Sequence, residues 1–174
     1  MSTELFVEYT LESAPPGSRR LMEGTVRHLG HLAPAVARLA GSPQTLEGFL
    51  KASALFEATT LAPIAREVVI MTIATRNGCH VCVIMHTARL HRLGADPELL
   101  AALQEARGLA DPVLEAIRVF TLAVLATSGA VDDATLIAFL ARGYTTANAL
   151  EVVLGIGAYT MSTLANRLTG ASAG

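Results

Sequence analysis

The chain has 174 residues, of which 52% are hydrophobic and 16% charged, and its formal net charge at neutral pH is −2. This balance, with one lysine and scattered arginines, argues against a nucleic-acid surface, so no such partner is expected. A membrane span needs about 20 consecutive apolar residues, and the best candidate, residues 149–164, is shorter and contains Glu151. We therefore expect no membrane partner. The hydrophobic excess predicts instead a homo-oligomer that buries apolar surface between its copies.

The first nine residues carry Glu4 and Glu8 and lack the basic start and apolar core of a secretory signal. We therefore expect a cytoplasmic protein. Its two cysteines belong to one C-x-x-C, and in the cytoplasm that spacing indicates redox or metal chemistry rather than a structural bridge.

Apolar residues recur at intervals of three and four along nearly the whole chain, which predicts an all-α fold. The length suits a single domain over residues 1–174. Helix starts are marked where Ser42, Asp96 and Asp111 each precede a proline, because a capping side chain is then followed by a favourable first helical residue. In chain order we expect an N-terminal arm over residues 1–17 and then helices at 18–29, 34–40, 43–57, 63–76, 79–93, 97–107, 112–128, 132–142 and 146–169.

An Asn-Gly pair at residues 77–78 separates two of these helices and predicts an αα-hairpin. The second helix of the hairpin begins with Cys79, and Cys82 and His86 follow at spacings of three and four. These spacings place the three side chains on one face of the helix. Two thiols one turn apart are able to close a disulfide where the first turn allows a short separation.

Either cysteine is a candidate nucleophile. Cys79 lies in the first turn, where the helix dipole favours a thiolate, whereas His86 lies one turn beyond Cys82 and is placed to take its proton. We favour Cys82, because a base one turn away acts directly on the thiol and the dipole is a weaker, screened effect.

Glu67 is an acid followed by the apolar residues 68–71, so we expect it to lie in a largely buried helix. A carboxyl group in that position is a candidate proton carrier. The alternative is a structural salt bridge to Arg66, Arg76 or another arginine, and the spacing does not separate the two.

Glu67, Cys79, Cys82 and His86, at these spacings and followed by Leu-His-Arg-Leu-Gly at residues 90–94, resemble the signature of the alkylhydroperoxidase D (AhpD)-like group. That group belongs to the carboxymuconolactone decarboxylase superfamily. The resemblance implies an all-α bundle with the C-x-x-C on a central helical hairpin. It also implies a homotrimer or homohexamer that uses no metal and no other cofactor.

The resemblance also implies roles for single residues. Cys82 matches the cysteine that attacks a peroxide and becomes a sulfenic acid, and Cys79 matches the cysteine that condenses with it to a disulfide. Glu67 and His86 match members of a proton relay. The implied function is a cysteine-based alkyl hydroperoxide reductase, with an organic hydroperoxide or disulfide as substrate and a thiol reductant or redox adaptor as electron donor.

His80 marks a departure from the family pattern. In the better-known peroxidases of the group that this chain resembles, the motif is Cys-x-His-Cys. Here Val81 stands before the second cysteine, and the histidine comes one position earlier. One residue turns a helical side chain by about 100°, so His80 does not inherit the relay role. We keep it as a possible accessory residue at the site entrance or against a neighbouring subunit, or as an exposed residue of the first turn.

Three other functions compete with this interpretation. The first is a zinc site formed by Cys79, Cys82 and His86, with Glu67 as a fourth ligand, although ligands on one regular helix converge poorly on a tetrahedral ion. The second is a lyase or hydrolase like other branches of the superfamily, which typically lack the cysteine pair. The third is a non-catalytic oligomeric module. Tyr159 and Asn166, on the apolar last helix, are expected to form buried hydrogen bonds near the site or a subunit interface.

Overall fold

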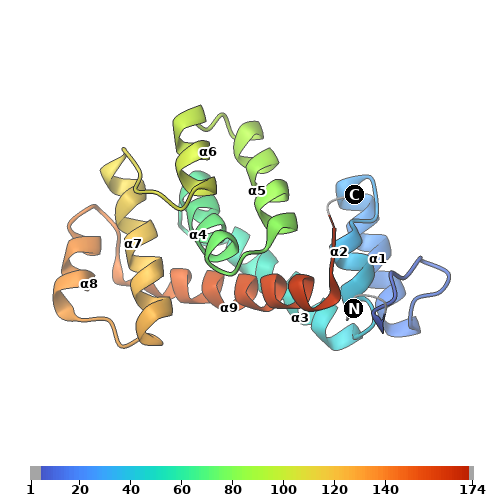
Figure 1. The fold of residues 1–174 in the computed structure, drawn as a ribbon. Helices are drawn as coiled ribbons and strands as arrows, with labels where there is room; N and C mark the ends of the chain where they lie inside the picture. The colour runs from blue at the N-terminus through green and yellow to red at the C-terminus, as the bar shows by residue number, and fades with distance from the viewer. Residues whose placement is uncertain (1–4, 173–174) are drawn as a thin grey trace.

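The computed structural model describes residues 5–172, which form α-helices and no strand (Figure 1). The all-α prediction is therefore confirmed for this range. The helices are α1 (Pro16–Leu29), α2 (Pro34–Leu39), α3 (Pro43–Glu57), α4 (Pro63–Arg76), α5 (His80–Arg92), α6 (Pro97–Gln104), α7 (Pro112–Thr127), α8 (Asp133–Leu140) and α9 (Thr146–Thr169).

Each helix begins and ends within three residues of its predicted bounds. The predicted caps at Ser42, Asp96 and Asp111 are present, since each side chain accepts a hydrogen bond from a backbone N–H of the following turn. The predicted arm is two residues too long. Pro16 is already the first residue of α1, because its fixed φ suits the first position of a helix. Residues 1–4 of the predicted arm lie outside the described residues.

Helix α4 lies at the centre of the main hydrophobic core. Every residue from Glu67 to Ala74 is buried, because α3, α5, α6, α7 and α9 all pack against this helix. In Figure 1, α9 runs along one side of the molecule, from α7 and α8 at one end to α1 and α2 at the other. A helix buried on all sides gives its one acidic residue little contact with water.

A second, smaller core joins the N-terminal arm to α1, α2 and the start of α3. Arg38 connects this unit to the end of α9, because its Nη1 donates to the carbonyl oxygens of Phe6 at 3.1 Å and of Thr169 at 2.8 Å. Its Nε lies 3.5 Å from a carboxylate oxygen of Glu8. The N-terminal unit is thereby held against the C-terminal half of α9.

The outer face of α9 carries large apolar side chains that remain exposed. They recur at helical spacing along one stripe, formed by Leu150, Val153, Met161, Leu164 and Leu168. Within residues 5–172, no helix is both long enough and apolar enough to cross a membrane.

Candidate active site

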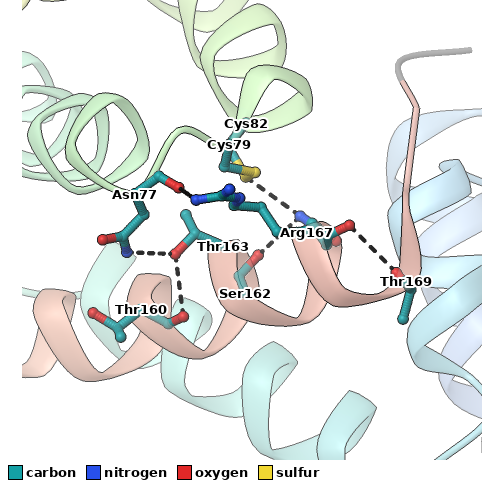
Figure 2. Close-up of a disulfide and its surroundings, with 9 residues drawn as sticks. Asn77, Cys79, Cys82, Thr160, Ser162, Thr163, Arg167 and Thr169 are labelled. Carbon is teal, nitrogen blue, oxygen red and sulfur yellow. Dashed lines mark hydrogen bonds between the residues drawn. A yellow bond between two sulfur atoms is a disulfide. The ribbon is translucent and has the colours of Figure 1, made fainter. Parts of the chain in front are cut away.

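The turn between α4 and α5 positions the two cysteines. Gly78 adopts a left-handed conformation with φ of 63°, which glycine tolerates without strain, so the predicted αα-hairpin forms here. Two side chains of α9 hold the turn: Arg167 donates to the backbone oxygen of Asn77, and the Asn77 amide donates to Thr163 Oγ1 at 2.9 Å (Figure 2). The start of α5 is therefore fixed against α9.

Cys79 and Cys82 are joined in a disulfide, with their Cα atoms 5.4 Å apart (Figure 2). Cys79 is the N-cap of α5 and Cys82 lies in its first turn. The pair is almost completely buried, with exposed fractions of 1% for Cys79 and 4% for Cys82. From α9, Asn166 donates a hydrogen bond to the Cys82 sulfur at 3.3 Å.

Glu67 contacts both His86 and an arginine, so the expected ion pair is present, and its role as a proton carrier stays a prediction. His86 Nδ1 lies 2.7 Å from Glu67 Oε2 in a hydrogen bond. The other oxygen, Oε1, lies 3.0 Å from Arg89 Nε, an ion pair that lacks the alignment of a hydrogen bond. Arg89 is thus the arginine partner, in place of Arg66 or Arg76.

Arg89 lies between two carboxylates and links α3, α4 and α5. Its Nη2 donates to Glu57 Oε2 at 2.5 Å, while its Nε faces Glu67. Burial by itself would lower the pKa of the Arg89 guanidinium, but the charges of Glu67 and Glu57 outweigh it and the pKa is raised. Arg89 therefore keeps a permanent positive charge beside the carboxyl group that holds His86.

Tyr159 forms an aromatic wall beside His86. The two rings meet edge to face with centroids 5.4 Å apart, and Phe49 and Phe56 pack on the same tyrosine at 6.0 and 5.9 Å. The Tyr159 hydroxyl lies 3.1 Å from Ser53 Oγ, as expected for a buried polar group. Burial raises the pKa of Tyr159 to about 12, with a further increase from the nearby carboxylates, so the phenol stays protonated at neutral pH.

A cavity of about 530 Å³ lies next to this site. On one side it is lined from α5 and α9 by Cys82, Met85, His86, Tyr159, Ser162 and Asn166. Residues of α1, α2 and α3 form the other side. Of the two cysteines, Cys82 is among the described residues that line the cavity and Cys79 is not.

His80 lies exposed in the first turn of α5 and is not among the described residues that line the cavity. This is the exposed first-turn position considered from the sequence. Within residues 5–172, no three His, Cys, Asp or Glu side chains gather in an arrangement suited to a metal ion.

Sequence reasoning missed Arg89, Arg20 and Arg27, and it expected Asn166 near the site without naming its partner. The contact of Arg89 with Glu67 joins two helices, and spacing along one helix does not reveal it. The hydrogen bond from Asn166 joins positions 84 residues apart. Arg20 and Arg27 line the cavity from α1, and their spacing of seven, which puts them on one face, was the available signal.

Residues 43–119 match the model of the carboxymuconolactone decarboxylase family. No curated protein matches the chain. Among solved structures, the chain is similar to an uncharacterised peroxidase-related protein from Ralstonia eutropha JMP134, described as an alkylhydroperoxidase AhpD core. The TM-score is 0.86 at 19% identity, covering 97% of this chain and 91% of the other.

Two further structures have the same fold. A peroxidase-related protein from Silicibacter sp. TM1040 gives a TM-score of 0.79 at 16% identity, covering 97% of this chain and 91% of the other. The debrominase Bmp8, solved in complex with 2,3,4-tribromopyrrole, gives 0.70 at 17% identity, covering 91% of this chain and 86% of the other. The chain therefore matches the family model over residues 43–119 and shares its fold with AhpD-like structures.

Proposed function

We propose that the protein is a cysteine-based alkyl hydroperoxide reductase that cycles through the Cys79–Cys82 disulfide. The observation that supports this most strongly is the unequal placement of the two sulfurs. Cys82 lines the cavity, whereas Cys79 is bonded to it from the side of the α4–α5 turn. Such an arrangement suits one thiol that meets the substrate and another that resolves the product.

In the proposed reaction, the Cys82 thiolate attacks the terminal oxygen of the hydroperoxide R–O–O–H. The O–O bond breaks, the sulfur becomes a sulfenic acid, and the alkoxide leaves as the alcohol R–OH after taking a proton. The Cys79 thiolate then attacks the Cys82 sulfur, and the hydroxide leaves as water. Two electrons from an external dithiol, or from two thiols, restore the reduced pair.

His86 is the residue we propose to move the proton. A carboxylate at Glu67 accepts the hydrogen bond from Nδ1, which leaves Nε2 as the basic nitrogen of the ring. His86 and Cys82 both line the cavity, one turn apart on α5. His86 is therefore placed to take the thiol proton and then to protonate the departing oxygen, with Glu67 as its orienting partner.

The proposal also predicts an electron donor and a cellular compartment for the protein. It requires a thiol reductant or redox adaptor, and it fits the cytoplasm, where thiols are kept reduced. The chemistry needs no metal and no organic cofactor, because the two sulfurs hold both electrons of each cycle.

Oxidation of the reduced protein by tert-butyl hydroperoxide tests the proposal. Mass spectrometry after thiol alkylation should show one intramolecular disulfide that a dithiol reverses. Cys82→Ser should abolish turnover, while Cys79→Ser should leave a sulfenic acid trapped on Cys82. The reverse pattern would make Cys79 the nucleophile, and thiols that stay free under excess hydroperoxide would refute the proposal.

A second candidate is a non-peroxidase reaction, as in other branches of the superfamily. The observation that favours it is the aromatic wall of Phe49 and Tyr159 beside Cys82, in a fold shared with a debrominase that binds 2,3,4-tribromopyrrole. Bromide release from that compound in the presence of a dithiol, without disulfide formation by tert-butyl hydroperoxide, would favour this candidate.

A further inference from the structure

The cavity beside Cys82 carries a charge pattern that reduction of a peroxide does not require. Arg20, Arg27 and His28 line it from α1, and none of the described lining residues is Asp or Glu. The chain as a whole has a net charge of −2, so this pattern does not follow from its composition. The cavity is suited to a ligand that carries negative charge.

The two arginines are available to such a ligand. Arg20, Gly24 and Arg27 are spaced four and three apart, which places them on the face of α1 that borders the cavity. Both arginines are exposed and therefore lie at its edge. No ion pair between residues 5–172 involves either of them.

The interior of the cavity is apolar. Leu21 of α1, Val36 and Leu39 of α2, and Phe49 and Leu50 of α3 line it opposite the cysteine. Its volume of about 530 Å³ is in the range of pockets that enclose a drug-sized ligand. A hydrocarbon chain or ring system therefore fits between the charged edge and Cys82.

Asn166 provides a polar group at the sulfur end. Its amide nitrogen is bound to Cys82, but its oxygen, Oδ1, is buried and has no partner among the described residues. The side chain is 3% exposed and lines the cavity. An unpaired buried acceptor is unfavourable, and an O–H group of a bound ligand would satisfy it.

We propose that this cavity binds carboxylated amphiphiles, with the carboxylate at Arg20 and Arg27 and the apolar body extending toward Cys82. Resting on the proposed function, the substrates are then hydroperoxides of such molecules. The hydroperoxide O–H donates to Asn166 Oδ1, which places the terminal oxygen beside the sulfur. Guanidinium groups suit this ligand because they bind carboxylates with paired hydrogen bonds.

Fluorescence titration with cis-parinaric acid and its methyl ester tests the charge preference without any redox step. The acid should bind about tenfold more tightly than the ester. The double variant Arg20→Gln/Arg27→Gln should lose this difference by weakening the acid alone. Arg92→Gln, which removes an exposed arginine outside the cavity lining, is the matched control and should keep it.

Gly24→Leu tests the location. A side chain at this position meets only the end of Arg27, at 3.8 Å, so leucine extends into the cavity without a backbone clash. It should reduce binding of both the acid and the ester at least tenfold. Gly48→Leu is the control, because Gly48 has open space around it and is not among the described lining residues.

Equal affinity for acid and ester, no binding of either, or full binding by Gly24→Leu would each overturn the inference. Disulfide formation by tert-butyl hydroperoxide separates this outcome from the proposed function. If the disulfide forms but parinaric acid does not bind selectively, the reductase proposal stands and the substrate class is wrong. If the acid binds selectively but Cys82 is not oxidised, the amphiphile site stands and the reductase proposal fails.

Discussion

The carboxyl group of Glu67 divides its two oxygens between His86 and Arg89. Glu67→Gln keeps the size of the side chain but removes the charge that supports proton uptake by His86. We expect oxidation of the reduced thiols by tert-butyl hydroperoxide to slow about 100-fold, the usual contribution of a positioned general base. The rate is measured by thiol alkylation at timed intervals.

Glu57→Gln is the matched control for this change. Glu57 also contacts Arg89, but it makes no contact with His86. Its variant should oxidise at a nearly unchanged rate. Equal losses in the two variants would show that Glu67 acts only by holding Arg89 in place.

Ionisation of Tyr159 should make the stability of the folded protein depend on pH in the alkaline range. The phenol has a pKa of about 10 in an unfolded chain, and burial raises the pKa of Tyr159 to about 12 in the folded protein. Its stabilising contribution is therefore complete below pH of about 10 and is lost as the pH rises through about 12. The loss corresponds to about 3 kcal/mol.

Denaturant unfolding between these pH values measures the effect. In Tyr159→Phe, the free energy of unfolding should decline less steeply with pH than in the wild type, because phenylalanine does not ionise. The tyrosinate absorbance step near pH 12 should become smaller, with the remainder due to Tyr144, because burial raises the pKa of Tyr144 to about 12 as well. Identical pH dependence in the two proteins would contradict the buried, protonated phenol.

At the scale of the helices, a glycine of α9 lies directly against a side chain of α3. A Cβ built on Gly155 would lie 2.6 Å from a ring carbon of Phe56, whereas a Cβ on Gly157 meets nothing within 4 Å. Gly155→Ala should therefore destabilise the protein by about 1–3 kcal/mol through overpacking. Gly157→Ala should stabilise it by about 0.5–1 kcal/mol, because alanine favours the helix.

Chemical denaturation of the two glycine variants should show a lower free energy of unfolding for Gly155→Ala and a higher one for Gly157→Ala. The substitutions are identical and lie in the same helix, so differences in helix propensity cancel. Stabilisation by Gly155→Ala would mean that the contact between α3 and α9 is looser than described.

The helices were the most predictable part of the molecule. Ser42, Asp96 and Asp111 cap their helices through local hydrogen bonds, so the neighbouring sequence is sufficient to locate the starts. The arm was predicted two residues too long, because Pro16 serves equally well as the last residue of a loop and as the first of a helix.

The candidate site was most predictable where its residues share a helix. The hairpin spacing correctly placed Cys82 and His86 together at one face of α5. Asn166 was expected near the site or a subunit interface, but its hydrogen bond to Cys82 depends on how α9 packs on α5, and no short-range pattern records that packing. Glu67 was predicted to be a buried acid, but its contacts with both His86 and Arg89 become apparent only in the folded structure.

At the scale of the whole molecule, the exposed apolar stripe on α9 supports the predicted self-association. Leu150 is 72% exposed and Leu164 is 55% exposed, and soluble monomers rarely keep a continuous apolar patch of this kind. We propose that copies of the chain meet on this stripe as a trimer or hexamer. Sedimentation velocity should give a mass of several multiples of 18.2 kDa.

The variant Val153→Glu/Leu164→Glu should sediment as a monomer, because it places two charges in the proposed interface. Leu55→Glu is the control, since Leu55 is 62% exposed on α3 and lies away from α9's stripe. A monomeric wild type, or a variant that keeps the mass of the wild type, would exclude this interface.

On the proposed mechanism, the burial of the disulfide restricts how the two reactants reach it. Only Cys82 opens on the cavity, and both sulfurs are shielded from bulk water by the packing around them. On the proposed mechanism, the hydroperoxide and the regenerating thiol therefore use one entrance and cannot occupy it together. A broad folded surface would not reach the sulfur, so the electron donor must present its thiol on a slender arm. A large excess of either the hydroperoxide or the thiol should then inhibit the reaction of the other. Turnover should be fastest when their concentrations are balanced.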